Sequence, residues 1–167
     1  MKKICLAILL GSALVVPNFA LALDKPRGPV VLTVHGVLTH PNDGKDATFD
    51  LPMLEALAGR AATMSTPWTE GKTAFSGPLL SAILEASGAN GRALKVTALN
   101  DYSAEIPIDD ALKVKTILAT RMNGKLMSVR DKGPLFLIYP FDTNPELYNE
   151  KYFSRSVWQI MKIEIEE

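Results

Sequence analysis

The start of the chain constrains most strongly what the rest of it can fold into. A short basic segment, residues 1–3, precedes the apolar run Ile4–Val16, and small residues follow at Ala20 and Ala22. This layout predicts a secretory signal peptide over residues 1–22, with export to the periplasm. A retained membrane anchor is the alternative, which the shortness of the run disfavours. Because the single cysteine, Cys5, lies inside the run, we expect the mature chain to fold without a disulfide bond.

The mature chain, residues 23–167, is predicted to form a single domain with its own core. The full chain carries 18 Lys and Arg against 18 Asp and Glu, so the loss of Lys2 and Lys3 leaves a slightly acidic domain. Its sequence contains no basic run, which argues against a nucleic-acid partner. It also contains no second long apolar run, so we expect no membrane insertion after cleavage.

Strand patterns outnumber helix patterns along the mature chain. Asn123-Gly124 is a strong signal for a β-hairpin turn. Together these patterns predict an α+β fold, with a mixed β-sheet or open barrel and a few short helices. The segments whose β-branched or alternating apolar residues predict strands are Val30–Leu38, Ala62–Trp68, Leu94–Leu99, Thr116–Met122, Leu135–Pro140 and Val157–Ile165.

Two segments carry helix signals. Asp50 is placed to cap a short helix that begins at Leu51 and has a proline in its first turn. The clearest helix pattern runs over Phe75–Gly88, with Pro78 near its start and Gly88 as its C-cap. Residues 141–153 are predicted to form a polar, aromatic loop.

A dense polar stretch follows the strand pattern that ends at Leu99. Asn100, Asp101, Tyr102 and Ser103 come directly after it. Asn, Asp and Ser are common in turns because their side chains bond the nearby backbone. The alternative is that a strand end delivers polar groups to a ligand at the rim of a sheet. This stretch alone favours the turn.

The residue types argue against several kinds of catalytic site. His35 and His40 are the only histidines and flank a turn without a third metal ligand. No nucleophile elbow and no glycine-rich phosphate loop occur in the sequence. The adjacent acids Asp109 and Asp110 are explained by a solvated turn. We therefore predict no catalytic residue and no metal ligand.

The aromatic, acidic and basic side chains of the mature chain suit the binding of a flat, polar heterocycle. Aromatic rings stack on such a ligand, a carboxylate accepts two parallel N–H bonds, and Arg or Lys binds a carbonyl oxygen. For Trp68 and Trp158 the alternative is core packing. For Arg130 and Arg155 it is a surface ion pair of small energetic value.

Several segments resemble a known family. Their order and spacing over residues 30–165 are similar to the molybdopterin-binding domain of the sulfite-oxidase superfamily. The segments are Phe75–Leu80, Ala98–Ser103, Ile117–Ala119, Met122–Leu126, Gly133–Pro140 and Arg155–Trp158.

One departure from that family changes what the resemblance implies. In its molybdenum enzymes a cysteine thiolate binds the metal, on the strand before a tryptophan-containing turn. Here the corresponding segment reads Met64-Ser65-Thr66-Pro67-Trp68. A hydroxyl is a poor substitute for a thiolate on such a metal. The resemblance therefore implies the pterin-binding fold without molybdenum.

The small, exported and cysteine-less mature chain also resembles the PruR-like periplasmic pterin-binding regulators of this superfamily. That resemblance implies a non-enzymatic protein whose ligand is a reduced, metal-free pterin. It also implies a partner, the periplasmic domain of a membrane-bound diguanylate cyclase or phosphodiesterase, and a role in cyclic di-GMP signalling and biofilm control. The alternatives are a molybdopterin-dependent oxidoreductase, or a subunit of one, with a non-cysteine metal ligand, and an interaction module whose pocket has decayed.

On this interpretation the polar stretch after Leu99 becomes the best candidate for a wall of the pocket. The predicted ligand-binding residues are Trp68, Asn100, Asp101, Tyr102, Asp109, Arg130, Lys132, Arg155 and Trp158.

Overall fold

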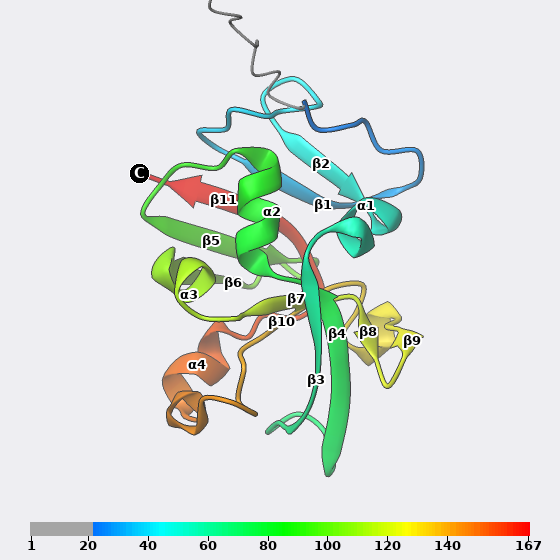
Figure 1. The fold of residues 1–167 in the computed structure, drawn as a ribbon, viewed down its shortest axis with the longest axis vertical. Helices are drawn as coiled ribbons and strands as arrows, with labels where there is room; N and C mark the ends of the chain where they lie inside the picture. Colours follow the sequence, from blue (N-terminus) through cyan, green and yellow to red (C-terminus); the bar gives the residue numbers. More distant parts are fainter. Residues whose placement is uncertain (1–21) are drawn as a thin grey trace, which may run out of the picture.

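The computed structural model describes residues 22–167, so most of the predicted signal peptide lies outside the described residues. The largest sheet has the strand order β2-β1-β11-β5-β6 and forms the upper half of the molecule in Figure 1. Its strands are β1 (Val30–His35), β2 (Ala47–Asp50), β5 (Ala93–Ala98), β6 (Ser103–Pro107) and β11 (Ile160–Glu166).

The large sheet is mixed, and one of its faces builds the core. Strand β1 runs parallel to β11, with Thr33 opposite Lys162, whereas the other neighbouring strands are antiparallel. In β5, Leu94 and Val96 are fully buried while Lys95 between them is exposed. This alternation is expected of a sheet that packs on the core with one face and meets solvent with the other.

Two smaller sheets complete the fold. The four-stranded sheet has the order β3-β4-β8-β9, and β7 and β10 form a two-stranded sheet. The predicted hairpin turn at Asn123 and Gly124 is confirmed, since both residues have the positive φ that such a turn requires. The strands are β3 (Gly59–Ser65), β4 (Lys72–Pro78), β7 (Ile117–Ala119), β8 (Arg121–Met122), β9 (Lys125–Leu126) and β10 (Phe136–Ile138).

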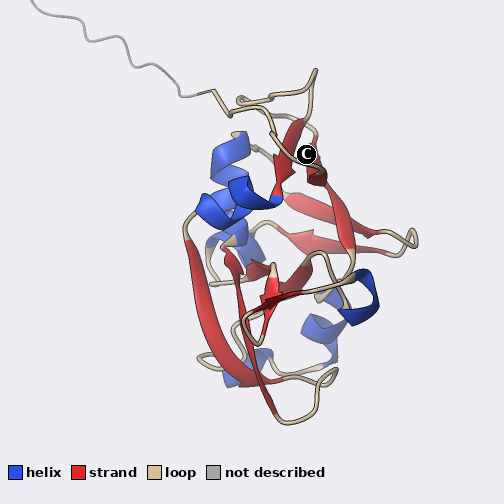
Figure 2. Ribbon diagram, turned by 90° about the vertical axis from the view of Figure 1, so that its right-hand side faces the viewer, coloured by secondary structure: helices blue, strands red, loops and turns tan. Residues whose placement is uncertain are grey.

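Strands β3 and β4 form a long ribbon that projects beyond the large sheet (Figures 1 and 2). Near its base the ribbon lies close to β7. A Cβ atom on Gly77 of β4 would collide with the carbonyl oxygen of Leu118, so this approach requires glycine.

The helices are short, and α2 lies across one face of the large sheet. The N-cap predicted for Asp50 is confirmed, because its carboxylate accepts from the Met53 amide. Leu80, Ile83 and Leu84 of α2 are buried on the face of the large sheet that α2 covers in Figure 1. The helices are α1 (Leu51–Ala56), α2 (Leu80–Ser87), α3 (Asp109–Leu112) and α4 (Glu150–Arg155), with 3₁₀ turns η1 (Val129–Asp131) and η2 (Pro145–Leu147).

The structure corrects two sequence-based expectations. The helix predicted from Phe75 begins only at Leu80, because residues 72–78 form β4 and pair with β3 along its whole length. Thr73 and Phe75 are buried in that strand, and their burial in the sheet prevails over the helical spacing further along. The region 141–153, predicted as a loop, contains η2 and the first turn of α4, which Asn149 caps.

The α+β class with a mixed sheet and a few short helices is confirmed, and none of the three sheets in residues 22–167 closes into a barrel. Across the same residues no helix has the length and apolar character needed to cross a membrane.

Candidate ligand pocket

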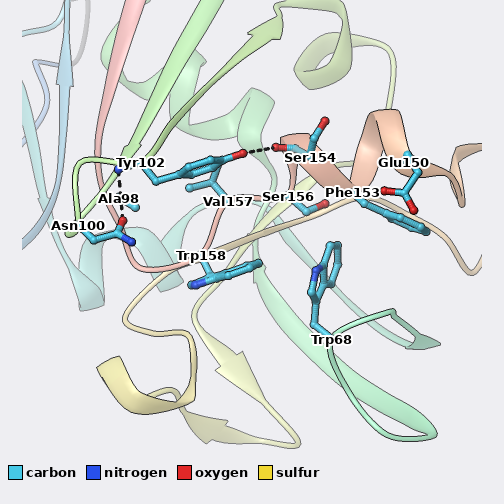
Figure 3. A pocket seen from close by; sticks show the side chains of 10 residues that line it. All are labelled: Trp68, Ala98, Asn100, Tyr102, Glu150, Phe153, Ser154, Ser156, Val157 and Trp158. Carbon is cyan, nitrogen blue, oxygen red and sulfur yellow. Dashed lines mark hydrogen bonds between the residues drawn. The ribbon is translucent and has the colours of Figure 1, made fainter.

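A pocket of about 410 Å³ lies between the β5–β6 turn, α4 and the segment that leads into β11 (Figure 3). Its volume falls within the range of roughly 300–1,000 Å³ that is typical of small-molecule sites. The residues that line it are Trp68, Ala98, Asn100, Tyr102, Glu150, Phe153, Ser154, Ser156, Val157 and Trp158.

The β5–β6 turn forms one wall of this pocket, and the turn predicted for this stretch is confirmed. Asp101 adopts a left-handed conformation with φ of 64°, which aspartate tolerates better than most residues. The Ala98 amide donates to the Tyr102 carbonyl, and the Asn100 side-chain oxygen accepts from the Tyr102 amide. The turn interpretation and the pocket interpretation are therefore compatible, since the same turn also places Asn100 and Tyr102 in the pocket.

Two exposed aromatic rings lie across the pocket from each other. Figure 3 draws Tyr102 on one side and Trp158 on the other, with the space of the pocket between them. Their exposed fractions are 51% and 38%, which is high for residues of this size. The Tyr102 hydroxyl donates to the Ser154 carbonyl and fixes its ring against α4. The arrangement offers two faces on which a flat ring can stack.

Trp68 closes the pocket beside Trp158 and is held by an aromatic cluster. Its ring centre lies 5.4 Å from that of Phe136, 5.7 Å from Phe153 and 6.3 Å from Trp158, each with edge-to-face geometry. Such contacts stabilise a pair of rings by more than the burial of their area alone. Trp68 therefore packs against the core and also lines the pocket, and its contact with a ligand stays a prediction.

Among the described residues that line the pocket, Glu150 is the only acidic or basic one. A basic group lies beside one wall of the pocket: the Nζ of Lys132 is 4.8 Å from the centre of the Trp158 ring. The pocket thus combines aromatic walls with one carboxylate, which favours a neutral ligand that carries N–H donors.

The nine predicted ligand-binding residues divide into three groups. Trp68, Asn100, Tyr102 and Trp158 line the pocket, and Lys132 stacks on one of its walls. Asp101, Asp109, Arg130 and Arg155 do not line it.

Of the residues outside the lining, Asp109 forms an exposed ion pair with Lys113 on α3, 2.7 Å apart. Asp101 is exposed in the turn and Arg130 is exposed on η1. Ligand contact by these three side chains stays a prediction that the geometry does not favour.

Arg155 has a structural partner. Its guanidinium donates to the Asp110 carboxylate at 2.8 Å, and Tyr139 donates to the same oxygen at 2.8 Å. Burial and the neighbouring Asp110 carboxylate raise the pKa of the Tyr139 hydroxyl well above its usual range, so this hydroxyl remains a donor. The network ties α4, and with it one side of the pocket, to α3.

The sequence analysis missed the residues that α4 supplies: Glu150, Phe153 and Ser154. One signal was available, because Asn149 stands at an N-cap position and its side chain accepts from the Lys151 amide. No local pattern indicates that this helix packs beside the β5–β6 turn.

The residues present do not fit a protein-held metal. Ser65 and Thr66, at the positions where the resemblance places a metal-binding thiolate, do not line the pocket. The Thr66 hydroxyl is already bonded to that of Thr69 at 2.8 Å. Within residues 22–167 no group of three or more His, Cys, Asp or Glu side chains is arranged to hold a metal.

A second hollow of about 370 Å³ lies beside β3 and β4 and contains two arginines. Arg121 binds Glu55 through two of its nitrogens, and Arg60 binds Asp142 at 2.6 Å. Both guanidinium groups are already neutralised, so the aromatic pocket is the better candidate site.

Comparison with known proteins gives a family match and a structural match. Residues 47–164 match the family model described as the oxidoreductase molybdopterin binding domain. No curated protein matches the chain in sequence. The fold is similar to that in the crystal structure of the sulfane dehydrogenase SoxCD from Paracoccus pantotrophus, with a TM-score of 0.60 and 16% sequence identity. The match covers 81% of this chain and 37% of that one, so the chain spans just over a third of the length of its structural neighbour.

Proposed function

The chain belongs to the oxidoreductase molybdopterin-binding domain family, and on this premise we propose that it is a non-enzymatic receptor for a metal-free, reduced pterin. The observation that carries the proposal is the pocket between Tyr102 and Trp158, which offers two ring faces and, among the described residues, no cluster of metal-binding side chains. The expected family and the sulfite-oxidase-type fold are both confirmed. The receptor role is a proposal that goes beyond this family and fold.

The shape and chemistry of the pocket support a pterin ring. A pterin is a flat bicycle that stacks on aromatic faces, and its pyrimidinone side carries N–H donors. The pocket supplies the faces through Tyr102 and Trp158 and an acceptor through Glu150. The hydroxyls of Ser154 and Ser156 donate to backbone carbonyls, which leaves their oxygens as further acceptors.

The donor set supports a ligand without molybdenum. A soft thiolate is the side chain expected on such a metal, and the only cysteine of the chain, Cys5, lies in the predicted signal peptide. The hydroxyl of Thr66 is engaged within its own turn, and Ser65 is exposed outside the pocket.

A second candidate is a molybdopterin-dependent oxidoreductase, or a subunit of one, whose metal takes no cysteine. Membership of a family described as oxidoreductase favours it. In that case the same aromatic pocket holds the pterin part of the cofactor.

The cellular role in the proposal rests on the resemblance to PruR-like proteins and on the predicted signal peptide. In this role the protein resides in the periplasm and relays pterin occupancy to the periplasmic domain of a membrane-bound diguanylate cyclase or phosphodiesterase. Biofilm formation then responds to pterin supply. Co-purification of such an enzyme with the tagged protein, sensitive to added pterin, tests this part separately.

Calorimetry with tetrahydrobiopterin tests the ligand. The mature protein is expected to bind it, Trp158→Ala to weaken binding, and Leu112→Ala to leave it unchanged. Leu112 is the matched control because it is 59% exposed and lies on α3, outside the pocket. Absence of binding by the mature protein contradicts the proposal. Stoichiometric molybdenum in protein exported from a cofactor-making cell favours the oxidoreductase instead.

A further inference from the structure

We infer that Glu150 is the specificity-determining residue of the pocket: its carboxylate binds the 2-amino and N3–H edge of the ligand and selects a 2-amino-4-oxopteridine over a 2,4-dioxopteridine. This inference rests on the proposed function and goes beyond it by assigning which edge of the ring is recognised and by which side chain.

The carboxylate is available for a ligand. In the described part of the chain Glu150 makes no hydrogen bond or ion pair through its side chain, although it lines the pocket. Its neighbours are engaged elsewhere: Glu146 accepts from Asn144 at 3.0 Å, and Lys151 lies over the ring of Tyr152. Among residues 22–167, no basic side chain lines the pocket to neutralise Glu150.

The backbone that carries Glu150 is fixed. Asn149 caps the first turn of α4 through the Lys151 amide. The other end of this helix is anchored by the ion pair between Arg155 and Asp110, and Tyr102 is bonded to its Ser154 carbonyl. A helix held at both ends presents its first side chain in a reproducible place, as selective binding requires.

The position of Glu150 also sets the orientation of the ligand. Figure 3 places Glu150 and Asn100 at opposite ends of the pocket. With the pyrimidinone edge at Glu150, the pyrazine ring and its substituent lie toward Asn100, which is exposed. The amide of Asn100 both donates and accepts, and so suits a polar substituent there.

The chemistry of the edge determines the selectivity. In a pterin, the 2-amino group and N3–H are adjacent, parallel donors, and a carboxylate offers two parallel acceptors. In lumazine the 2-amino group is replaced by a carbonyl oxygen, which repels a carboxylate. The ring faces of the two compounds are alike, so Tyr102 and Trp158 stack equally well on both. Any difference in their affinity then reports on the edge alone.

The test compares pterin and lumazine on the mature protein, by quenching of tryptophan fluorescence. The wild type is expected to prefer pterin by about 10- to 100-fold, the value of hydrogen bonds to a charged group. Glu150→Gln is expected to remove most of that preference, because its amide presents one donor and one acceptor and so complements the lumazine edge. Glu146→Gln, a second Glu→Gln change four positions away, is expected to keep the wild-type ratio.

Each outcome distinguishes the inference from the proposed function. A pterin preference that survives in Glu150→Gln overturns the role of Glu150 and leaves the receptor intact. Equal affinity of the wild type for the two compounds does the same. Failure of both compounds to bind a wild type that does bind tetrahydrobiopterin overturns the inference alone, and failure of all three compounds overturns the receptor as well. Because Glu150 is exposed, its substitution is expected to leave the melting temperature of the protein unchanged.

Discussion

The hydroxyl of Tyr102 donates a hydrogen bond to the backbone carbonyl of Ser154, 3.1 Å away and 52 positions along the chain. This contact joins the β5–β6 turn to α4, the two elements that face each other across the pocket. It holds the Tyr102 ring in place even though half of that side chain is exposed.

Substitutions of Tyr102 separate the ring from its hydroxyl. Tyr102→Ala is expected to weaken pterin binding by about 1–3 kcal/mol, the usual value of an aromatic stack on a heterocyclic base. Tyr102→Phe keeps the ring and loses a hydrogen bond worth about 0.5–1.5 kcal/mol, so its affinity lies between that of Tyr102→Ala and the wild type. Calorimetry on the three proteins checks this order. Equal affinity of Tyr102→Ala and the wild type contradicts stacking on this ring.

The two tryptophans of the chain both line the pocket but differ in packing. Trp158 exposes a face to it, whereas Trp68 is held edge-to-face by Phe136 and Phe153. We expect bound pterin to quench mainly the fluorescence of Trp158. Trp68→Phe then keeps most of the quenching and Trp158→Phe loses it. The reverse pattern indicates that the ligand lies against Trp68.

The ion pair between Arg155 and Asp110 is expected to matter for stability. Its side chains are 19% and 11% exposed, so Arg155→Met leaves a nearly buried carboxylate unpaired. The expected loss is about 3 kcal/mol in the free energy of unfolding, the lower end for breaking a buried pair. Urea unfolding measures it.

The control for this pair is Glu55→Gln, which breaks the more exposed pair of Glu55 with Arg121. Pairs of that kind contribute about 1 kcal/mol or less. Equal losses of unfolding free energy in Arg155→Met and Glu55→Gln contradict the idea that burial strengthens the pair of Arg155 with Asp110.

Stability is expected to fall in acid through Asp50. Hydrogen bonds from the amides of Met53, Gly28 and Arg27 hold the pKa of its carboxyl below its usual range. A lowered pKa in the folded state stabilises the protein above the pKa of the unfolded state, about 3.9, and this stabilisation is lost as pH falls through the folded-state value.

The variant Asp50→Asn lacks this titration. The difference in unfolding free energy between wild type and variant is therefore expected to shrink as the pH is lowered from about 6 to about 2. Urea titrations across that range measure it. If the difference in unfolding free energy stays constant with pH, the acid sensitivity comes from other carboxyl groups. Glu55 is the next candidate, because its hydrogen bond with Arg121 also lowers its pKa.

Local chemistry made much of the fold predictable. The Asp50 cap, the αL conformation of Gly88 and the Asn123-Gly124 turn depend on residues adjacent in sequence, and all three occur as predicted. Strand β4 was missed because its extended form depends on seven cross-strand pairs with β3, which no local pattern reveals.

The pocket was predictable only in part, for the same reason. The four predicted residues that do line the pocket are aromatic or polar and stand beside strand patterns, which is why the sequence indicated them. They are Trp68, Asn100, Tyr102 and Trp158. Glu150 lies in a region that was interpreted as a loop, and its place in the pocket depends on a helix that packs against distant segments. Conversely, Arg155 has the chemistry of a ligand contact but pairs with Asp110, which is 45 positions away in sequence.

The parallel pairing of β1 with β11 has a consequence for how the chain reaches its native state. Strand β11 lies in the middle of the large sheet, between β1 and β5, yet among the described strands it comes last in the sequence. Until residues 160–166 pair with both neighbours, β1 and β5 have no strand between them and their facing backbone edges are unpaired. Closure of so long a loop is slow. The large sheet is therefore expected to assemble late in folding, after the β3–β4 ribbon, whose two strands are separated by only six residues.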